Sequence, residues 1–201
     1  MKNLKQTVIK IASASLPTTH GVFNTVIYKS TRDELEHVVL VRGSNFKKPV
    51  LVRIHSQCLT GDVFSSLKCD CKDQLTTSLI RIGKAKSGVL IYLNQEGRGI
   101  GLGNKIKAYA LQEKGVDTVN ANNALGLHSD ARSYQVAADI LKDLKIKTIN
   151  LLTNNPDKID QLTQYGITVN KRIPLEVAPN QKNKSYLKTK KDKLGHKLNL
   201  V

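Results

Sequence analysis

Runs of apolar residues separated by polar stretches mark the predicted strands of this chain. Residues 22–28 and 36–41 are short β-branched runs on either side of a polar stretch, which predicts an antiparallel β-hairpin. Residues 49–55 are predicted as a third strand, and residues 88–93 form a continuous apolar run that is typical of a buried strand. Two later strands are predicted at residues 147–152 and 167–173.

Patterns typical of helices follow several of these strands, at residues 74–83, 104–114, 132–145 and 155–166. The second helix is followed by Gly115, a residue type that commonly ends helices. The fourth starts at Asn155 and Pro156, because asparagine caps free N–H groups and proline is favoured in the first turn. Residues 117–123 fit a strand or a loop, and the pattern does not decide between the two.

The order of these elements predicts a mixed α/β fold, in which an antiparallel hairpin is followed by alternating strands and helices around a mixed sheet. The chain has 201 residues and is 40% hydrophobic, which is enough for a real core. Without a repeat or an inner linker, we expect one domain over residues 1–178 and a basic tail of the same domain over residues 179–201. No apolar run reaches 18 residues, so no membrane span is expected.

The formal charge of +16 points to an anionic partner such as nucleic acid, an anionic membrane or a phosphorylated ligand. Residues 179–201 hold seven lysines against one aspartate, and such a segment is predicted to be solvated and partly disordered. Only 4% of the residues are aromatic and tryptophan is absent. This composition weakens the case for single-stranded nucleic acid, whose bases stack on aromatic rings.

All three cysteines of the chain lie in one short stretch, at Cys58, Cys69 and Cys71. An odd number, with two of them one residue apart, argues against disulfides and for a reducing compartment, and no secretory signal is evident, so we expect a cytoplasmic protein. Three thiolates suit zinc and leave its fourth tetrahedral position open, as in catalytic zinc sites. The alternative, ordinary core cysteines or inert thiols, stays open at this point.

The loop at residues 94–103 has glycine at every second position from 97 to 103 and lies between a predicted strand and a predicted helix. Backbone N–H groups in such a loop can bind phosphate, although the spacing matches neither the Walker A nor the dinucleotide-binding pattern. Glu96 can accept hydrogen bonds from a guanine edge or hold a metal, and Arg98 suits phosphate. A flexible surface turn is the alternative.

Two further positions carry charges at predicted helix starts. Lys158 follows Thr153 at the fourth helix, where a cation is unfavourable for the helix dipole, so a role in ligand binding is favoured over a solvated side chain. Asp130 and Arg132 stand at the third helix, where an aspartate is usually only a cap. By themselves these two residues are more typical of a structural pair than of a catalytic one.

Five motifs together resemble those of one enzyme family in their order and in their amino-acid sequence. They are RIHSQCLTGDVFSSLKCDCKDQL, NQEGRGIGLGNKIKAYALQEKGVDTVNAN, LGLHSDARSY, LLTNNPDK and YLKTKKDKLGHKL. The combination is similar to GTP cyclohydrolase II, the enzyme that opens riboflavin biosynthesis, and it covers roughly residues 18–198.

The resemblance implies a role for each matching residue. Cys58, Cys69 and Cys71 match the zinc ligands, Asp130 the proton acceptor, Arg132 the proposed nucleophile, and Tyr109 a tyrosine near the reacting base. The positions that match GTP contacts are Arg53, Ile54, His55, Ser56, Gln57, Gln74, Glu96, Gly97, Arg98, Thr118, Thr153 and Lys158.

The implied reaction converts GTP and water into formate, pyrophosphate and 2,5-diamino-6-(ribosylamino)pyrimidin-4-one 5′-phosphate, in a homodimer that uses Zn²⁺ and Mg²⁺. Water activated by zinc suits the opening of the imidazole ring, since bulk water is too weakly acidic. Arg98, Arg132, Lys158 and Mg²⁺ suit the charge on the triphosphate. Arginine is an unusual covalent nucleophile because its pKa stays above about 12, so a purely electrostatic Arg132 remains open.

Three positions depart from the family pattern. Gln57 stands where the family usually has glutamate, Ala131 lies between Asp130 and Arg132 in place of glutamate, and Lys72 replaces glycine after the last cysteine. None removes an implied ligand or catalytic residue, so we expect activity to be retained. Two alternatives are a homologue that performs only part of the reaction and, less favoured, a basic zinc module that binds nucleic acid. The latter lacks a fourth close ligand of the zinc-finger type, and we expect no nucleic-acid partner.

Overall fold

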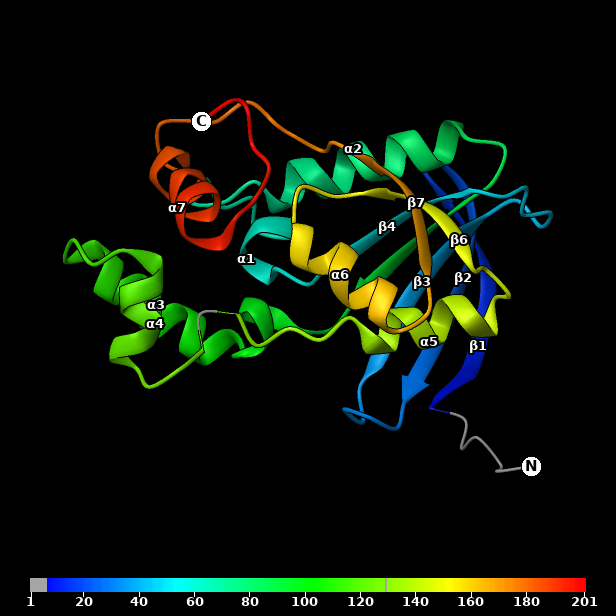
Figure 1. The fold of residues 1–201 in the computed structure, drawn as a ribbon, viewed down its shortest axis with the longest axis horizontal. Coiled ribbons are helices and arrows are strands. Elements are labelled where there is room, and N and C mark those ends of the chain that lie inside the picture. Colours follow the sequence, from blue (N-terminus) through cyan, green and yellow to red (C-terminus); the bar gives the residue numbers. More distant parts are fainter. Residues whose placement is uncertain (1–6, 129) are drawn as a thin grey trace.

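The computed structural model describes residues 7–128 and 130–201, which form a mixed sheet with helices on both faces and further helices at one end (Figure 1). The strands are β1 (Val8–Thr18), β2 (Gly21–Ser30), β3 (Glu36–Arg42), β4 (Val50–Ser56), β5 (Gly88–Leu93), β6 (Thr148–Leu152) and β7 (Thr168–Ile173). The helices are α1 (Leu59–Asp62), α2 (Cys71–Lys84), the 3-10 turn η1 (Glu96–Gly99), α3 (Leu102–Glu113), α4 (Thr118–Ala124), α5 (Gln135–Asp143), α6 (Pro156–Gln164) and α7 (Lys184–Leu194).

The seven strands lie in the order β1-β2-β3-β5-β4-β6-β7. The pairs from β1 to β5 in this order are antiparallel, and those from β5 to β7 are parallel. The predicted mixed α/β fold with an antiparallel start is therefore confirmed. Because β4, β5 and β6 are mutually parallel, their carboxyl ends meet at one edge of the sheet, which is where open α/β sheets place their ligand sites.

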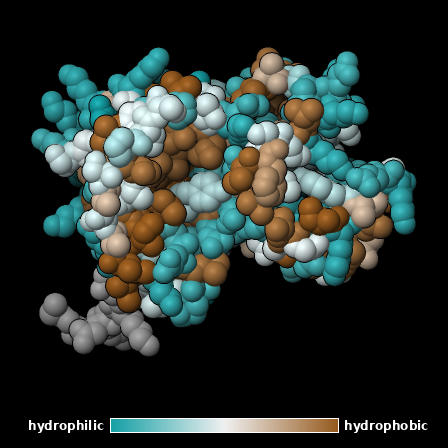
Figure 2. Space-filling view, turned by 180° about the vertical axis from the view of Figure 1, so that it is seen from behind, coloured by the Kyte–Doolittle hydropathy of each residue, from teal (hydrophilic) through white to brown (hydrophobic). Residues whose placement is uncertain are grey.

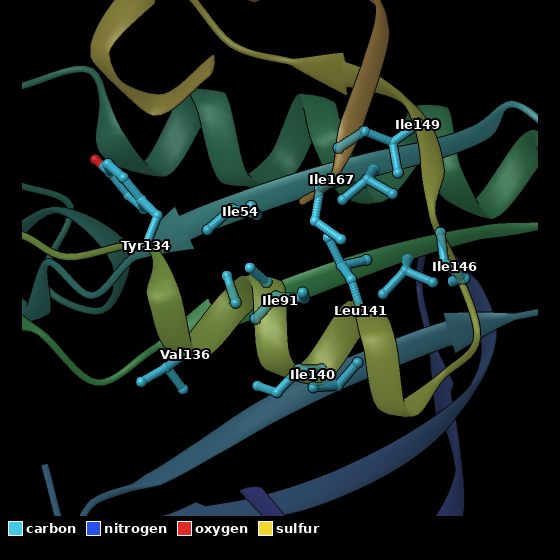
Figure 3. Packing of buried hydrophobic residues seen from close by; sticks show 14 of the residues in the cluster. Ile54, Ile91, Tyr134, Val136, Ile140, Leu141, Ile146, Ile149 and Ile167 are labelled. Atoms are coloured by element: carbon cyan, nitrogen blue, oxygen red, sulfur yellow. The ribbon is translucent and has the colours of Figure 1, made fainter. Parts of the chain in front are cut away.

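The core lies on both faces of this sheet. On one face, α5 and α6 bury a large cluster against alternate strand residues, and Figure 3 shows Ile140 and Leu141 of α5 in this cluster with Ile54 of β4 and Ile91 of β5. On the other face, α2 buries a smaller cluster around Ile82. Burial of apolar area on both faces is the main stabilising contribution, and it holds the parallel strands in register.

The structure differs from the sequence prediction at the two ends of the fold. Strand β1 was not predicted, because its sequence VIKIASASLPT mixes small, polar and apolar residues and nearly all of it is exposed at the sheet edge. The prediction of a solvated, partly disordered tail was wrong. Residues 184–194 form α7, which buries Leu187, and Leu198 beyond it is also buried.

Helix boundaries also moved, for local reasons. Residues 117–123 belong mostly to α4, because the Asp117 carboxylate accepts hydrogen bonds from the N–H groups of Val119 and Asn120, at 3.0 and 3.3 Å. Helix α2 starts at Cys71, three residues before the predicted start, and α5 starts at Gln135 instead of residue 132. In residues 7–128 and 130–201, no helix has the length and apolarity that are needed to cross a membrane.

Truncation of the α5 core should destabilise the fold strongly. We expect Ile140→Ala to lower the free energy of unfolding by about 3 kcal/mol, because Ile140 is 0% exposed and its removal leaves a cavity. Ile106→Ala is the matched control, since Ile106 is 48% exposed on α3, and it should change the value by about 0.5 kcal/mol or less. Urea denaturation measures both, and equal losses would contradict this account of the core.

Candidate functional site

A cavity lies beyond the carboxyl ends of β4, β5 and β6. The helices α3, α4 and α7 lie at this end of the sheet (Figure 1). Most of the predicted site residues line the cavity, namely Arg53, His55, Ser56, Gln57, Cys58, Cys69, Cys71, Gln74, Glu96, Gly97, Arg98, Tyr109, Thr118, Arg132, Thr153 and Lys158. Two predicted residues are not in its lining. Ile54 is 0% exposed in the core, and Asp130 is joined to the cavity through Arg132.

The three cysteines converge, as the sequence predicted. Their sulfur atoms all lie within 4.8 Å of one another, with Cys58 just before α1 and Cys69 and Cys71 at the start of α2. Gly61 of α1 packs directly against them, because a Cβ at this position would lie 2.8 Å from the Cys69 sulfur and 3.1 Å from the Cys58 sulfur. The chain thus comes close to the sulfurs from one side, and the donor set fits a soft divalent ion such as zinc.

A buried lysine that the sequence analysis missed compensates the charge of this cluster. Lys105 Nζ donates to the Cys58 sulfur at 3.1 Å, to Thr60 Oγ1 at 2.8 Å and to Glu96 Oε1 at 2.9 Å. Burial opposes its charge, yet the Glu96 hydrogen bond and the Cys58 charge raise the pKa of Lys105 overall. Hydrogen bonds from Cys69 and Cys71, together with the charge of Lys105, lower the pKa of the Cys58 thiol.

Glu96 is therefore held rather than free. Its Oε1 accepts from Lys105 and from the Gly97 N–H at 2.9 Å, and its Oε2 accepts from the Leu59 N–H at 2.6 Å. A carboxylate with this many donors is fixed in position. Glu96 therefore connects the glycine loop to the cysteine stretch. The sequence signal that could have indicated Lys105 is its spacing of three residues from Ala108, which places both on the buried face of α3.

His55 belongs to a buried polar group next to the sulfurs. Its Nε2 lies 3.1 Å from both Asp62 oxygens, which makes Nε2 the donor, and its ring stacks on Tyr92 with centroids 5.4 Å apart. Asp62 also accepts from the Tyr92 hydroxyl at 2.8 Å and from the Cys58 N–H at 3.0 Å. Burial lowers the pKa of His55, so it is a neutral imidazole whose Nδ1 faces Arg53. Asp62 and Tyr92, neither predicted, orient His55 and the backbone of a cysteine.

A chain of side chains continues from Arg53 into the C-terminal segment. Arg53 donates to the Leu152 carbonyl at 3.0 Å and to Gln74 Oε1 at 2.8 Å, and Gln74 Nε2 donates to Asp70 at 2.5 Å. Asp70, which lies between two of the cysteines, also accepts from Lys190 at 2.8 Å. Burial lowers the pKa of Arg53 to about 10, so its guanidinium is still charged at neutral pH. The chain links β4, α2 and α7.

Asp130 and Arg132 form the pair that their spacing suggested. Arg132 Nε donates to Asp130 Oδ1 at 2.8 Å, and its NH2 group donates to Oδ2. Burial alone would raise the pKa of Asp130, but the hydrogen bonds and charge of Arg132 lower it. The pKa of Arg132 is raised by Tyr134 and Asp130, so the guanidinium stays charged. Within the pair, the Arg132 guanidinium lines the cavity, and Asp130 fixes its position.

Lys158 is buried in the first turn of α6, with 4% exposure. Its Nζ donates to the Ile54 carbonyl at 2.7 Å and lies 4.9 Å from the centroid of the Tyr134 ring. Burial and the nearby charges of Arg53 and Arg132 hold its pKa well below the usual value. An anion in the cavity would offset this repulsion, because it would favour the charged form of Lys158.

The glycine loop turns sharply at its start. Gly97 and Arg98 have φ values of 63° and 62°, in the left-handed region that glycine tolerates and arginine rarely adopts. The Arg98 carbonyl accepts from the Ala131 N–H at 3.1 Å, and Arg98 NH2 donates to the Tyr186 hydroxyl at 3.3 Å. The unusual backbone at Arg98 therefore directs its side chain toward α7.

Comparison with known sequences identifies the family. A sequence model of GTP cyclohydrolase II matches residues 9–174. The chain belongs to the GTP cyclohydrolase II family. It is also 51% identical over 195 residues to the riboflavin biosynthesis protein RibBA of Endomicrobium trichonymphae, and 52% identical over 194 residues to that of Bacillus cereus strain ATCC 14579.

Both alignments cover 96% of this chain but only 48% and 49% of those proteins, so the chain spans about half the length of the curated relatives it matches. A two-domain 3,4-dihydroxy-2-butanone 4-phosphate synthase from A. baumannii aligns with a TM-score of 0.47 and 20% identity, over 87% of this chain and 41% of that one. That likeness is too weak to carry a structural or functional argument.

Substitution of Gly61 should impair metal binding at the cysteines of this GTP cyclohydrolase II family member. We expect Gly61→Ala to weaken Co²⁺ binding about tenfold or more, because the added Cβ would lie 2.8 Å from the Cys69 sulfur and displace a ligand, and changes next to metal ligands commonly cost about this much. Gly103→Ala is the control, since a Cβ there has nothing within 4 Å. The charge-transfer absorption of cobalt thiolate measures both. Equal affinity of the two variants would contradict the proposed packing of Gly61 against the site.

Proposed function

We propose that this protein hydrolyses GTP as a GTP cyclohydrolase II in riboflavin biosynthesis. The products would be formate, pyrophosphate and 2,5-diamino-6-(ribosylamino)pyrimidin-4-one 5′-phosphate. The observation that carries the proposal is that the three-sulfur cluster and a group of buried cations line the same cavity. Ring opening needs an activated water, and loss of pyrophosphate needs cations, so one cavity offers the groups for both steps.

Cys58, Cys69 and Cys71 would hold a zinc ion. When bound there, zinc supplies a Lewis acid that lowers the pKa of water to about 7, which generates a nucleophile at neutral pH. Lys105 offsets the negative charge of the thiolates, and Asp62 holds the Cys58 N–H. His55 is neutral and oriented by Asp62, and its Nδ1 faces the Arg53 guanidinium, which also lines the cavity. Tyr109 lies beside Lys105 and Lys68, against the same cavity.

The triphosphate would bind among Arg98, Arg132 and Lys158, together with Mg²⁺. The guanidinium groups of Arg98 and Arg132, fixed before the substrate arrives, stabilise the charge that develops as pyrophosphate leaves, and the bound phosphates favour the charged form of Lys158. The raised pKa of Arg132 favours an electrostatic role for this residue over a covalent one, since a nucleophilic arginine would first have to lose its proton. Asp130 holds the guanidinium in place through two hydrogen bonds.

We further propose that the protein acts as a homodimer in the cytoplasm. Three free cysteines suit a reducing compartment. Figure 2 shows apolar side chains gathered over the strand half of the molecule, and Ile9, Ile11, Leu16 and Val22 of β1 and β2 are between 43% and 50% exposed. Apolar surface of this kind is typical of protein interfaces. The remaining alternative for the activity is a homologue that keeps the formyl group or only removes pyrophosphate.

The products released from GTP test this proposal. With Zn²⁺ and Mg²⁺ we expect one formate and one pyrophosphate for each GTP consumed, with the deformylated pyrimidine identified by mass spectrometry. Cys69→Ser should lose both bound zinc and formate release, because it removes one of three sulfur ligands. A product that retains the formyl group would select the partial reaction, and no turnover at all would refute the proposal.

The charge of Arg132 should matter more for turnover than for folding. We expect Arg132→Lys to reduce kcat/KM about 100-fold, because lysine cannot form the two parallel hydrogen bonds with Asp130 that fix the guanidinium. Arg81→Lys, at an exposed arginine of α2, is the control and should leave kcat/KM unchanged. Steady-state kinetics of pyrophosphate release measure both, and wild-type turnover of Arg132→Lys would argue against this role.

A further inference from the structure

The C-terminal segment, residues 179–201, lies beyond the family match, which ends at residue 174, yet it forms part of the cavity wall. It crosses to the helical end of the molecule, where α7 lies near α4 (Figure 1). Leu187 and Leu198 are buried, with 3% and 8% exposure, and fasten the segment to the body. Three of its side chains, Tyr186, Lys190 and His196, line the cavity.

Lys190 ties this segment to the metal-binding stretch. It is 8% exposed, and its Nζ donates to Asp70 Oδ1 at 2.8 Å, next to Cys69 and Cys71. The Asn183 amide adds a contact of 3.5 Å to the Cys69 carbonyl. A buried lysine that forms an ion pair with a buried aspartate holds its position, because separating the two would leave both charges uncompensated. The segment is therefore locked to the cysteine stretch through a charge pair.

Tyr186 ties the segment to the glycine loop. Its hydroxyl accepts a hydrogen bond from Arg98 at 3.3 Å, and its ring faces two cations, with Arg98 Cζ at 5.5 Å and Lys190 Nζ at 4.6 Å from the centroid. An aromatic face attracts cations at these distances. Tyr186 thus holds Arg98 and Lys190 together, although their charges repel each other.

His196 lies at the cavity wall after α7 has ended. Its backbone N–H donates to the Lys190 carbonyl at 3.1 Å, and the backbone N–H of the next residue, Lys197, donates to the Asn154 carbonyl at 2.9 Å. Burial, then the charges of Lys190 and Arg132, lower the pKa of His196 to about 3. The imidazole is neutral at pH 7, and one of its nitrogens is available as a donor to an anion in the cavity.

We propose that residues 179–201 complete the triphosphate subsite, with His196 as a phosphate-binding residue and with Lys190 and Tyr186 as positioning residues for Asp70 and Arg98. The inference rests on the proposed function, because the anion is taken to be the triphosphate of GTP. A bound polyphosphate offsets the mutual repulsion of Arg98, Arg132, Lys158 and Lys190. The segment therefore supplies part of the wall of the subsite whose positive charges the triphosphate neutralises.

Three ligands separate this role from a purely structural one. Titration calorimetry on the zinc-loaded full chain would measure the binding of inorganic tripolyphosphate, of guanosine, and of a GTP analogue with a methylene group between the α- and β-phosphates. The analogue resists pyrophosphate release, so binding is read without turnover. The variants are Lys190→Met and, as matched control, Lys188→Met at an exposed lysine two residues earlier on α7.

We expect Lys190→Met to weaken the binding of tripolyphosphate and of the analogue about tenfold or more, because it removes a cation from the cavity wall and leaves the Asp70 carboxylate without its partner, and to weaken guanosine binding less than about twofold. Lys188→Met should bind all three as the wild type does. Unchanged binding of the analogue by Lys190→Met, or an equal loss for guanosine, would overturn the proposal. Tyr186→Phe, which removes only the hydroxyl, should also weaken the two phosphorylated ligands and spare guanosine, and it serves if Lys190→Met fails to fold.

Failure of the two proposals can be told apart. If the wild type binds the analogue but releases neither formate nor pyrophosphate from GTP, the proposed function falls, while the role of the C-terminal segment is still judged by the variants. If the wild type turns GTP over and Lys190→Met keeps wild-type affinity for the analogue, the role of the segment falls and the proposed function stands.

Discussion

The parallel pairing of β4 with β5 and with β6 is the constraint on which the site depends. Each of these strands leads into a segment with chemistry, β4 into the cysteines, β5 into the glycine loop, and β6 into the corner at Thr153. Parallel strands end at the same edge, so three segments that are distant in sequence meet there without long connections. The helices that cover the two faces of the sheet stabilise this arrangement by burying apolar side chains against it.

Buried charges at this edge are organised as pairs that leave an overall positive cavity. Glu96 pairs with Lys105, Asp70 with Lys190, and Asp130 with Arg132. Breaking any of these buried pairs would be costly, because the remaining partner would lie uncompensated. Arg53 and Arg98 add further positive charge, and an anion in the cavity would favour the charged form of Lys158. A site built in this way suits a polyanionic ligand, which explains part of the large net charge without nucleic acid.

The C-terminal segment shows how composition can mislead. Its many lysines predicted a solvated tail, and most of them are indeed exposed on α7. Lys190 is the exception, because the carboxylate that it needs is supplied by Asp70, 120 residues earlier in the chain. Composition records how many lysines a segment has, but burial of one of them depends on a partner that only the fold brings near.

Local patterns in the sequence determined the mixed α/β fold, the central strands and the cysteine cluster as a metal-binding candidate, since periodicity and motif spacing are local properties. Most of the predicted residues that line the cavity came from the resemblance of the motifs to GTP cyclohydrolase II. The tertiary structure decided what those properties cannot contain. It brought Lys105 to the Cys58 sulfur, Asp62 to His55, and the C-terminal helix to the cavity. Each of these contacts joins residues on different elements. Polar and charged groups interact with whichever partner lies near them in space, and the hydrophobic periodicity of the sequence carries no information about that distance.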